Sequence, residues 1–212
     1  MEFLAFFWDV IVHLDKHLAV LLGQYGTWVY AILFAIIFCE TGLVITPFLP
    51  GDSLLFVAGA LWAASGLDIN ALALTIIVAA FCGDNVNYFI GRKLGPKVFR
   101  LESSRFFNRS ALDKTQAFYM RHGGKTVIMA RFIPLVRTFA PFVAGIGKMV
   151  YPRYILLSVV GSMLWVGVLA YGGYFFGNMP IVKTNLSTVI AVIIVISVAP
   201  IAIEYVRAKR RA

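Results

Sequence analysis

Long apolar runs separated by short polar segments dominate the chain. The runs 71–91, 154–176 and 186–206 are the most continuous of them. Because an α-helix rises 1.5 Å per residue, a run of this length crosses the ~30 Å hydrocarbon core of a bilayer. The pattern therefore predicts transmembrane helices over these runs and an all-α, polytopic membrane fold.

Two other apolar stretches are interrupted by helix-breaking residues. The piece 53–64 would extend only roughly 18 Å as a helix, too short to cross the membrane. The stretch 126–147 carries two arginines and a proline in its middle, and neither flank could span alone. The expected breakers are Pro47, Pro50 and Gly51 in the first stretch and Pro134 and Pro141 in the second. Since irregular backbone is tolerated at membrane depth only where it lines a cavity or packs in protein, both stretches are predicted to be re-entrant hairpins.

Two short motifs recur at a fixed distance along the chain. The tetrapeptide FVAG at 56–59 is repeated at 142–145, and YFIG at 88–91 is repeated as YFFG at 174–177. Both pairs lie 86 residues apart. One match could be chance in an apolar chain, whereas two at the same offset favour a duplicated unit of one hairpin and one span.

The charges that follow the two duplicated spans differ. Arg92 and Lys93 follow the first span at once, whereas the second is followed by Asn178 and later by a single lysine. Loops rich in lysine and arginine stay on the cytoplasmic side. We therefore expect 40–91 and 126–177 to form an inverted repeat, an architecture typical of transporters.

The remaining segments are predicted to lie at the membrane surface or in the cytoplasm. Segment 1–25 has polar residues at helical spacing, which is typical of an amphipathic interfacial helix. The basic loop 92–125 is placed in the cytoplasm, with a surface helix over 110–122. A basic tail follows the last span, 186–206. The chain is then a single membrane domain, 1–212, with both termini cytoplasmic.

Composition indicates that lipid is the solvent of much of this chain. It is 60% hydrophobic and 14% charged, whereas soluble proteins carry about 25% charged residues. The formal net charge is +9, and its basic residues stand between apolar runs, which favours contact with anionic lipids over nucleic-acid binding. Cys39 and Cys82 lack CxxC spacing, and His13 and His17 have no third ligand nearby, so no metal site is expected.

Several charged residues fall within or beside the apolar stretches, with Lys125 at their edge: Glu40, Asp52, Asp84, Arg131 and Arg137. A charge in the bilayer interior costs at least ~2.5 kcal/mol, so a cavity or an opposite charge must offset that cost. A turn at Pro134 would let Arg131 and Arg137 point into one cavity, where guanidinium groups suit a phosphate. The structural alternative is that acid–arginine pairs only lock the two hairpins together.

The acidic residues raise a hypothesis of proton coupling. A carboxyl group that is both buried and close to an arginine experiences opposing effects and can exchange a proton near neutral pH. Glu40 and Asp52 are the candidates beside the first turn, and Asp84 is a further cavity acid. Asp52 could instead cap a half-helix that starts at Ser53.

Other polar residues are expected to line the same cavity. Asp84, Asn87 and Tyr88 share one helical face by their i, i+3, i+4 spacing. Thr138, next to Arg137, is placed with them. Alternatively, Asp84, Asn87 and Tyr88 do not line a cavity and simply form the polar end of their helix near the cytoplasm.

Together these motifs resemble the DedA family, also called the SNARE-associated Golgi or VTT-domain family, over roughly 25–205. The resemblance is carried by ETGL at 40–43, PFLPGD at 47–52, Gly83 and Asp84 with Tyr88 and Gly91, HGGK at 122–125, ARFIP at 130–134, Arg137, Pro141 and Gly145. It implies a bacterial inner-membrane protein with two re-entrant hairpins, dependence on the proton-motive force, a part in envelope maintenance, and translocation of undecaprenyl phosphate. It also implies functional acids at Glu40 and Asp52 and functional arginines at Arg131 and Arg137.

The expected function is transport of an anionic lipid phosphate, with membrane lipids and polyprenyl phosphate as partners. No cofactor is expected, a proton is the candidate coupling ion, and a homo-oligomer is compatible with the sequence. A phospholipid scramblase and a proton-coupled ion or drug exchanger are alternatives, and an assembly factor stays open. An enzyme is not expected, since a lipid phosphatase needs a nucleophile with an acid/base set and only His122 lies near.

Overall fold

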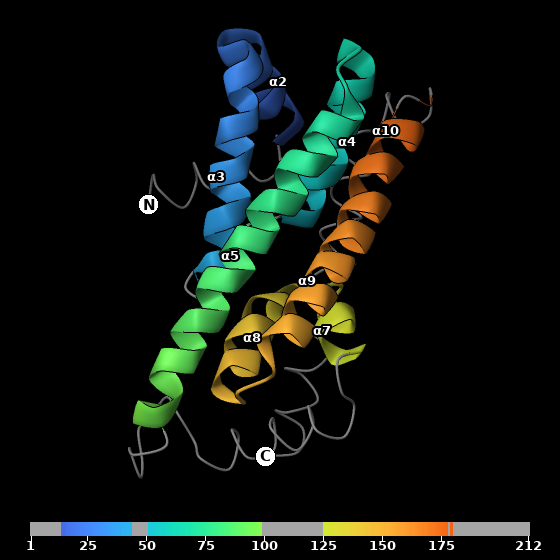
Figure 1. Ribbon diagram of the computed structural model, residues 1–212. Coiled ribbons are helices and arrows are strands. Elements are labelled where there is room, and N and C mark those ends of the chain that lie inside the picture. Colours follow the sequence, from blue (N-terminus) through green and yellow to red (C-terminus); the bar gives the residue numbers. More distant parts are fainter. Residues whose placement is uncertain (1–13, 44–50, 99–124, 178, 180–212) are drawn as a thin grey trace, which may run out of the picture. The chain divides into compact units, whose positions relative to one another are not determined.

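The computed structural model describes residues 14–43, 51–98, 125–177 and 179 of the 212 (Figure 1). Within these ranges every regular element is a helix. In chain order they are α2 (Leu14–Tyr25), the 3-10 turn η1 (Gly26–Trp28), α3 (Val29–Gly42), α4 (Gly51–Ser65), α5 (Ile69–Val98), α7 (Lys125–Ala130), α8 (Pro134–Ile146), α9 (Tyr151–Val166), the π-helical segment η2 (Gly167–Tyr171) and α10 (Gly172–Phe176). The predicted all-helical fold class is confirmed for this part of the chain.

Three helical stretches are long and apolar enough to cross a membrane: Lys16–Gly42, Ile69–Leu94 and Tyr151–Phe176. The second and third contain the predicted spans 71–91 and 154–176. The predicted last span, 186–206, and the surface helix over 110–122 lie outside the described residues. The length and composition of these helices are consistent with a membrane protein.

The first of these stretches is divided at Gly26. The φ angle of Gly26 is +51°, a left-handed conformation that glycine adopts without steric cost. Helix α2 consequently ends at Tyr25, the boundary predicted for the N-terminal segment 1–25. The stretch Lys16–Gly42 adds a candidate span where the sequence predicts an interfacial helix and a separate apolar run.

The two expected hairpins contain short helices. Helix α4 has 15 residues and α8 has 13. At 1.5 Å per residue both are shorter than the hydrocarbon core. Helix α4 begins at Gly51 and α8 at Pro134, and proline is favoured in a first helical turn. Pro47 and Pro50 lie outside the described residues, and the re-entrant course of both stretches stays a prediction.

Pro141 does not break a helix, contrary to the prediction. It lies inside α8, which continues to Ile146. Proline lacks the N–H that would bond the carbonyl four residues earlier, but neighbouring groups satisfy such carbonyls in membrane helices. The break in the second stretch falls instead at residues 131–133, just before Pro134.

The chain forms two compact units, and each combines segments from both halves of the sequence. One unit comprises 1–35, 48–76 and 166–212, and the other comprises 36–47 and 77–165. In the first unit α4 packs against η2 and α10. In the second unit α8 packs against α5. In both, a short helix from one predicted repeat lies against a long helical stretch from the other.

Glycines allow the backbones to approach closely in both units. A Cβ on Gly59 would overlap the carbonyl oxygen of Ala170 in the first unit. A Cβ on Gly145 would overlap the carbonyl oxygen of Tyr88 in the second. Gly59 and Gly145 are the equivalent last residues of the two FVAG motifs. Their shared role favours the predicted duplication, while the opposite orientation of the repeats stays a prediction.

Gly59→Ala is expected to destabilise the protein, because the added methyl group meets backbone rather than a movable side chain. Overpacking of this kind costs roughly 1–3 kcal/mol. Gly172→Ala is the matched control, since a Cβ there meets nothing within 4 Å, and alanine favours helix over glycine by up to ~1 kcal/mol. Thermal unfolding in detergent should show a lower midpoint for the first variant and an unchanged or higher one for the control. Equal midpoints would contradict the close approach.

Candidate functional site

A buried ion pair joins the end of α3 to α8 in the second unit. Arg137 donates a hydrogen bond from Nη2 to Oε1 of Glu40, which lies 97 residues earlier in the chain. The two side chains are 3% and 1% exposed. Charges so far from solvent are tolerated because each compensates the other, and removing one partner leaves an uncompensated buried charge.

A second buried ion pair joins α5 to the break between α7 and α8. Arg131 donates from Nη2 to Oδ2 of Asp84 and, at 3.1 Å, to Oγ of Ser158 on α9. The Ser158 hydroxyl in turn donates to Asp84 Oδ2 at 2.6 Å. Tyr154, one turn earlier on α9, donates to the backbone carbonyl of Asp84 at 2.9 Å. Two helices, α5 and α9, and the break before α8 therefore fix the Asp84 carboxylate and its arginine.

Asn87 joins α5 to the two helices that carry the Glu40–Arg137 pair. Its Nδ2 donates to the carbonyl oxygens of Thr41 and Thr138 at 3.0 and 2.7 Å. These two residues directly follow Glu40 and Arg137 in the sequence. Asn87 is fully buried, so the two hydrogen bonds form where water does not compete. The amide thereby clasps the backbone of α3 and α8 beside their ion pair.

An aromatic ring supports the Arg137 guanidinium from a different side. The Cζ atom of Arg137 lies 4.7 Å from the ring centroid of Trp165, near the end of α9. Trp165 is completely buried. A guanidinium over an indole face is attracted by the negative potential of that face, most strongly when both groups are desolvated. Helix α9 thus contacts both arginines.

The arrangement brings together four of the five charged residues that the sequence singled out. Glu40, Asp84, Arg131 and Arg137 belong to one compact unit, and Arg137 also attracts Asp84 electrostatically. Asp52 belongs to the other unit, in the first turn of α4. A carboxylate there is favoured by the positive end of the helix dipole, which is a structural role like the capping alternative.

The expected cavity-lining residues are all buried. Asn87 and Thr138 take part in the clasp described above. The Tyr88 ring stacks on Tyr154 with centroids 4.4 Å apart. The Tyr88 hydroxyl donates to the carbonyl of Met149 at 2.6 Å and accepts from Arg92 at 3.0 Å. Tyr88 therefore supports α9, whose side chains in turn hold Asp84.

Arg131 Nη1 and Asn87 Oδ1 are among the buried polar atoms that have no hydrogen-bond partner in the described residues. Arg131 is 3% exposed, so water does not satisfy its free donor from outside. A buried unsatisfied donor costs about 1–3 kcal/mol, and more when it is charged. An unpaired guanidinium N–H is a charged donor, and an anion is the kind of group that satisfies such a donor best.

The contribution of α9 was not predicted. The apolar run 154–176 predicts a plain span, whereas Ser158 and Trp165 contact the charged groups and Tyr154 bonds the backbone of Asp84. Their spacing of four and seven residues repeats one helical face. Serine and tyrosine on a single face of an apolar helix were the available signal. Polar residues inside membrane spans commonly bond across helices.

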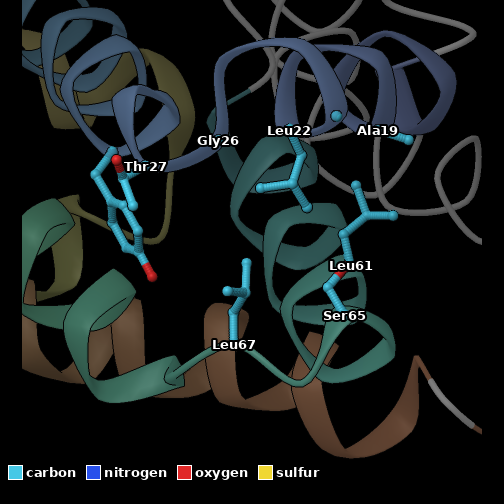
Figure 2. A pocket seen from close by; sticks show the side chains of 9 residues that line it. Ala19, Leu22, Gly26, Thr27, Leu61, Ser65 and Leu67 are labelled. Atoms are coloured by element: carbon cyan, nitrogen blue, oxygen red, sulfur yellow. The ribbon is translucent and has the colours of Figure 1, made fainter.

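A separate cavity of about 470 Å³ lies in the first unit, between α2, η1 and α4 (Figure 2). Its lining is Ala19, Leu22, Gly23, Gly26, Thr27, Tyr30, Leu61, Ser65 and Leu67. Figure 2 shows Leu22 of α2 and Leu61 of α4 on the wall of this cavity. The lining holds no charged side chain, so its chemistry suits an apolar group and not a phosphate.

Asn87→Leu is expected to lower the free energy of unfolding by roughly 2–5 kcal/mol, because two buried carbonyl groups lose their donor. The control is Asn85→Leu, since the Asn85 amide is only partly buried, donates within its own helix to Phe81 O and accepts a single hydrogen bond from α9, from Tyr151. Denaturant titration of the purified protein in detergent measures both changes. A smaller loss for Asn87→Leu than for Asn85→Leu would contradict the clasp.

Comparison with known proteins assigns the chain to a known family. A VTT-domain model matches residues 49–175. The chain is 55% identical to Protein DedA of Escherichia coli strain K12, covering 100% of this chain and 98% of that one. It is 43% identical to an uncharacterized membrane protein of Mycobacterium leprae over 84% of this chain and 82% of the relative, and 32% identical to inner membrane protein YghB of Escherichia coli strain K12 over 81% and 78%. No solved structure matches. The chain therefore belongs to the VTT-domain (DedA) family of membrane proteins.

Proposed function

We propose that this protein carries an anionic lipid phosphate, specifically undecaprenyl phosphate, across the bacterial inner membrane. The observation that carries the proposal is the pair of buried arginines in one unit, of which Arg131 keeps a donor, Nη1, without a partner among the described residues. Guanidinium groups bind phosphate oxygens through parallel hydrogen bonds and stay charged at any physiological pH.

The two guanidinium groups also favour an anion over a metal cation. A cation carrier needs carboxylates and carbonyls that are free of positive partners. Here Glu40 and Asp84 each already accept from an arginine. A phosphate could replace either carboxylate as the acceptor without creating a new unpaired charge on the arginine. The site therefore fits exchange of one oxyanion for another.

Charge balance links such an exchange to protons. The two ion pairs together have no formal net charge. A bound phosphate would add negative charge to a buried site, and an uncompensated buried charge is costly. Uptake of one proton by Glu40 or Asp84 removes one unit of that excess charge. We therefore propose that a proton enters with the phosphate, with Asp52 as a further acid in the other unit.

The lipid tail and the biological setting come from the family resemblance. The relatives' names describe membrane and inner-membrane proteins and say nothing of a cargo. A long prenyl chain would remain in the hydrocarbon while its phosphate crosses through the site. This division explains how a small polar site could carry a lipid much larger than itself.

The test is transport in liposomes that contain labelled undecaprenyl phosphate or labelled phosphatidylethanolamine. We expect selective movement of the phosphate lipid. Arg137→Gln should reduce the rate roughly 30-fold or more, because losing one partner of a buried charged pair costs about 2–5 kcal/mol. Glu40→Gln should weaken transport less. Arg153→Gln, which removes an exposed arginine, is the control and should leave the rate unchanged.

Three outcomes would overturn the proposal. Equal movement of both lipids would indicate a scramblase. Proton flux driven by a cation gradient without lipid movement would indicate an exchanger. Full transport by Arg137→Gln would remove the role of the buried site.

We also propose that both termini are cytoplasmic and that the two hairpins enter the membrane from opposite sides. Leu43 is the last described residue before α4, and Phe132 lies in the break between α7 and α8. Their side chains are 42% and 48% exposed. In a background with Cys39 and Cys82 replaced by alanine, a single cysteine at position 43 or 132 should react with an impermeant maleimide from opposite faces. Reaction of both from the same face would contradict the inverted repeat.

A further inference from the structure

Two contacts of Arg137 differ in kind. Its Nη2 donates to Glu40, while its Cζ lies over the face of the Trp165 ring, 4.7 Å from the centroid. The hydrogen bond needs an oxygen acceptor, whereas the attraction to the face of an aromatic ring is electrostatic and needs none. The two supports therefore do not compete, and one can be exchanged while the other stays.

Arg131 is supported differently. Its Nη2 donates to both Asp84 and Ser158, so the described contacts of its guanidinium are in its plane. Its aliphatic part crosses α9 at Gly161, where an added Cβ would lie 2.9 Å from Arg131 Cδ. Loss of Asp84 would leave Arg131 with the serine alone. Arg137 has, besides its carboxylate, a contact with the face of an aromatic ring.

We propose that Trp165 is a positioning residue that holds the Arg137 guanidinium in the site while Glu40 is exchanged for the phosphate of the substrate. The inference rests on the proposed function and deepens it. Exchange at Arg137 leaves a moment when neither oxyanion is fully bound, and a buried cation needs compensation then. The indole face supplies part of this compensation, together with the attraction of Asp84, and it is not an oxyanion that the phosphate would displace.

The binding test uses the full-length protein in nanodiscs of zwitterionic lipid, titrated with geranylgeranyl phosphate by calorimetry. Geranylgeraniol, which lacks the phosphate, corrects for binding of the chain alone. Trp165→Leu should weaken phosphate-dependent binding roughly 10- to 30-fold, because a desolvated cation–π contact is lost. Trp165→Phe keeps an aromatic face and should stay within about threefold of the original protein.

Trp62→Leu is the matched control for lost packing. Trp62 is also fully buried, but it belongs to the unit that does not hold the ion pairs. Within that unit its Nε1 donates to the Tyr30 hydroxyl at 2.9 Å. This variant should lose stability as Trp165→Leu does and keep the affinity for the phosphate. Equal weakening by both variants, or no weakening by Trp165→Leu, would overturn the inference and leave the proposed function standing.

A second measurement needs no ligand and separates this inference from the proposed function. If Trp165 holds Arg137 when Glu40 is absent, Glu40→Gln and Trp165→Leu together should lower the thermal midpoint by more than the sum of the single changes. Additive effects would contradict the positioning role. Failure of the original protein to bind geranylgeranyl phosphate, with the non-additivity intact, would instead remove the proposed substrate class.

Discussion

Charges held away from water need an opposite charge beside them, and the unit formed by 36–47 and 77–165 is arranged around that requirement. Arg137 and Arg131 meet carboxylates 97 and 47 residues away in the chain, so the same contacts that neutralise the charges also tie α3, α5 and the start of α8 together. Stability and the proposed transport then depend on the same groups. In the proposed exchange a substrate that binds a guanidinium displaces a buried carboxylate, and protonation would remove the charge of that carboxylate.

Much of the fold could be predicted because it depends on local properties. Hydrophobic run length identifies α5 and the stretch from α9 to α10, and the breakers identify the starts of α4 and α8. The exception is Pro141, which lies within α8 because a membrane helix can satisfy the freed carbonyl by other means. Sequence alone does not distinguish a proline that ends a helix from one that is accommodated in it.

The charged residues of the site could be predicted from the sequence, but which acid pairs with which arginine could not. Buried charges stand out in an apolar chain, so Glu40, Asp84 and both arginines could be selected by their cost alone. Which acid meets which arginine depends on packing of distant helices, and Asp52 belongs to another unit for the same reason. Trp165 was not selected because a tryptophan in an apolar run is ordinary, and its contact with Arg137 exists only after α8 and α9 pack.

The clasp made by Asn87 has a consequence for how this site can change over evolutionary time. Its two hydrogen bonds go to main-chain oxygens of residues 41 and 138, which every amino acid provides. Drift in the side chains at those two positions therefore leaves these bonds intact. Position 87 itself has little freedom, because a buried amide of the right reach must stand there. One side chain of α5 thus fixes the spacing of α3 and α8, while the side chains at positions 41 and 138 remain open to variation.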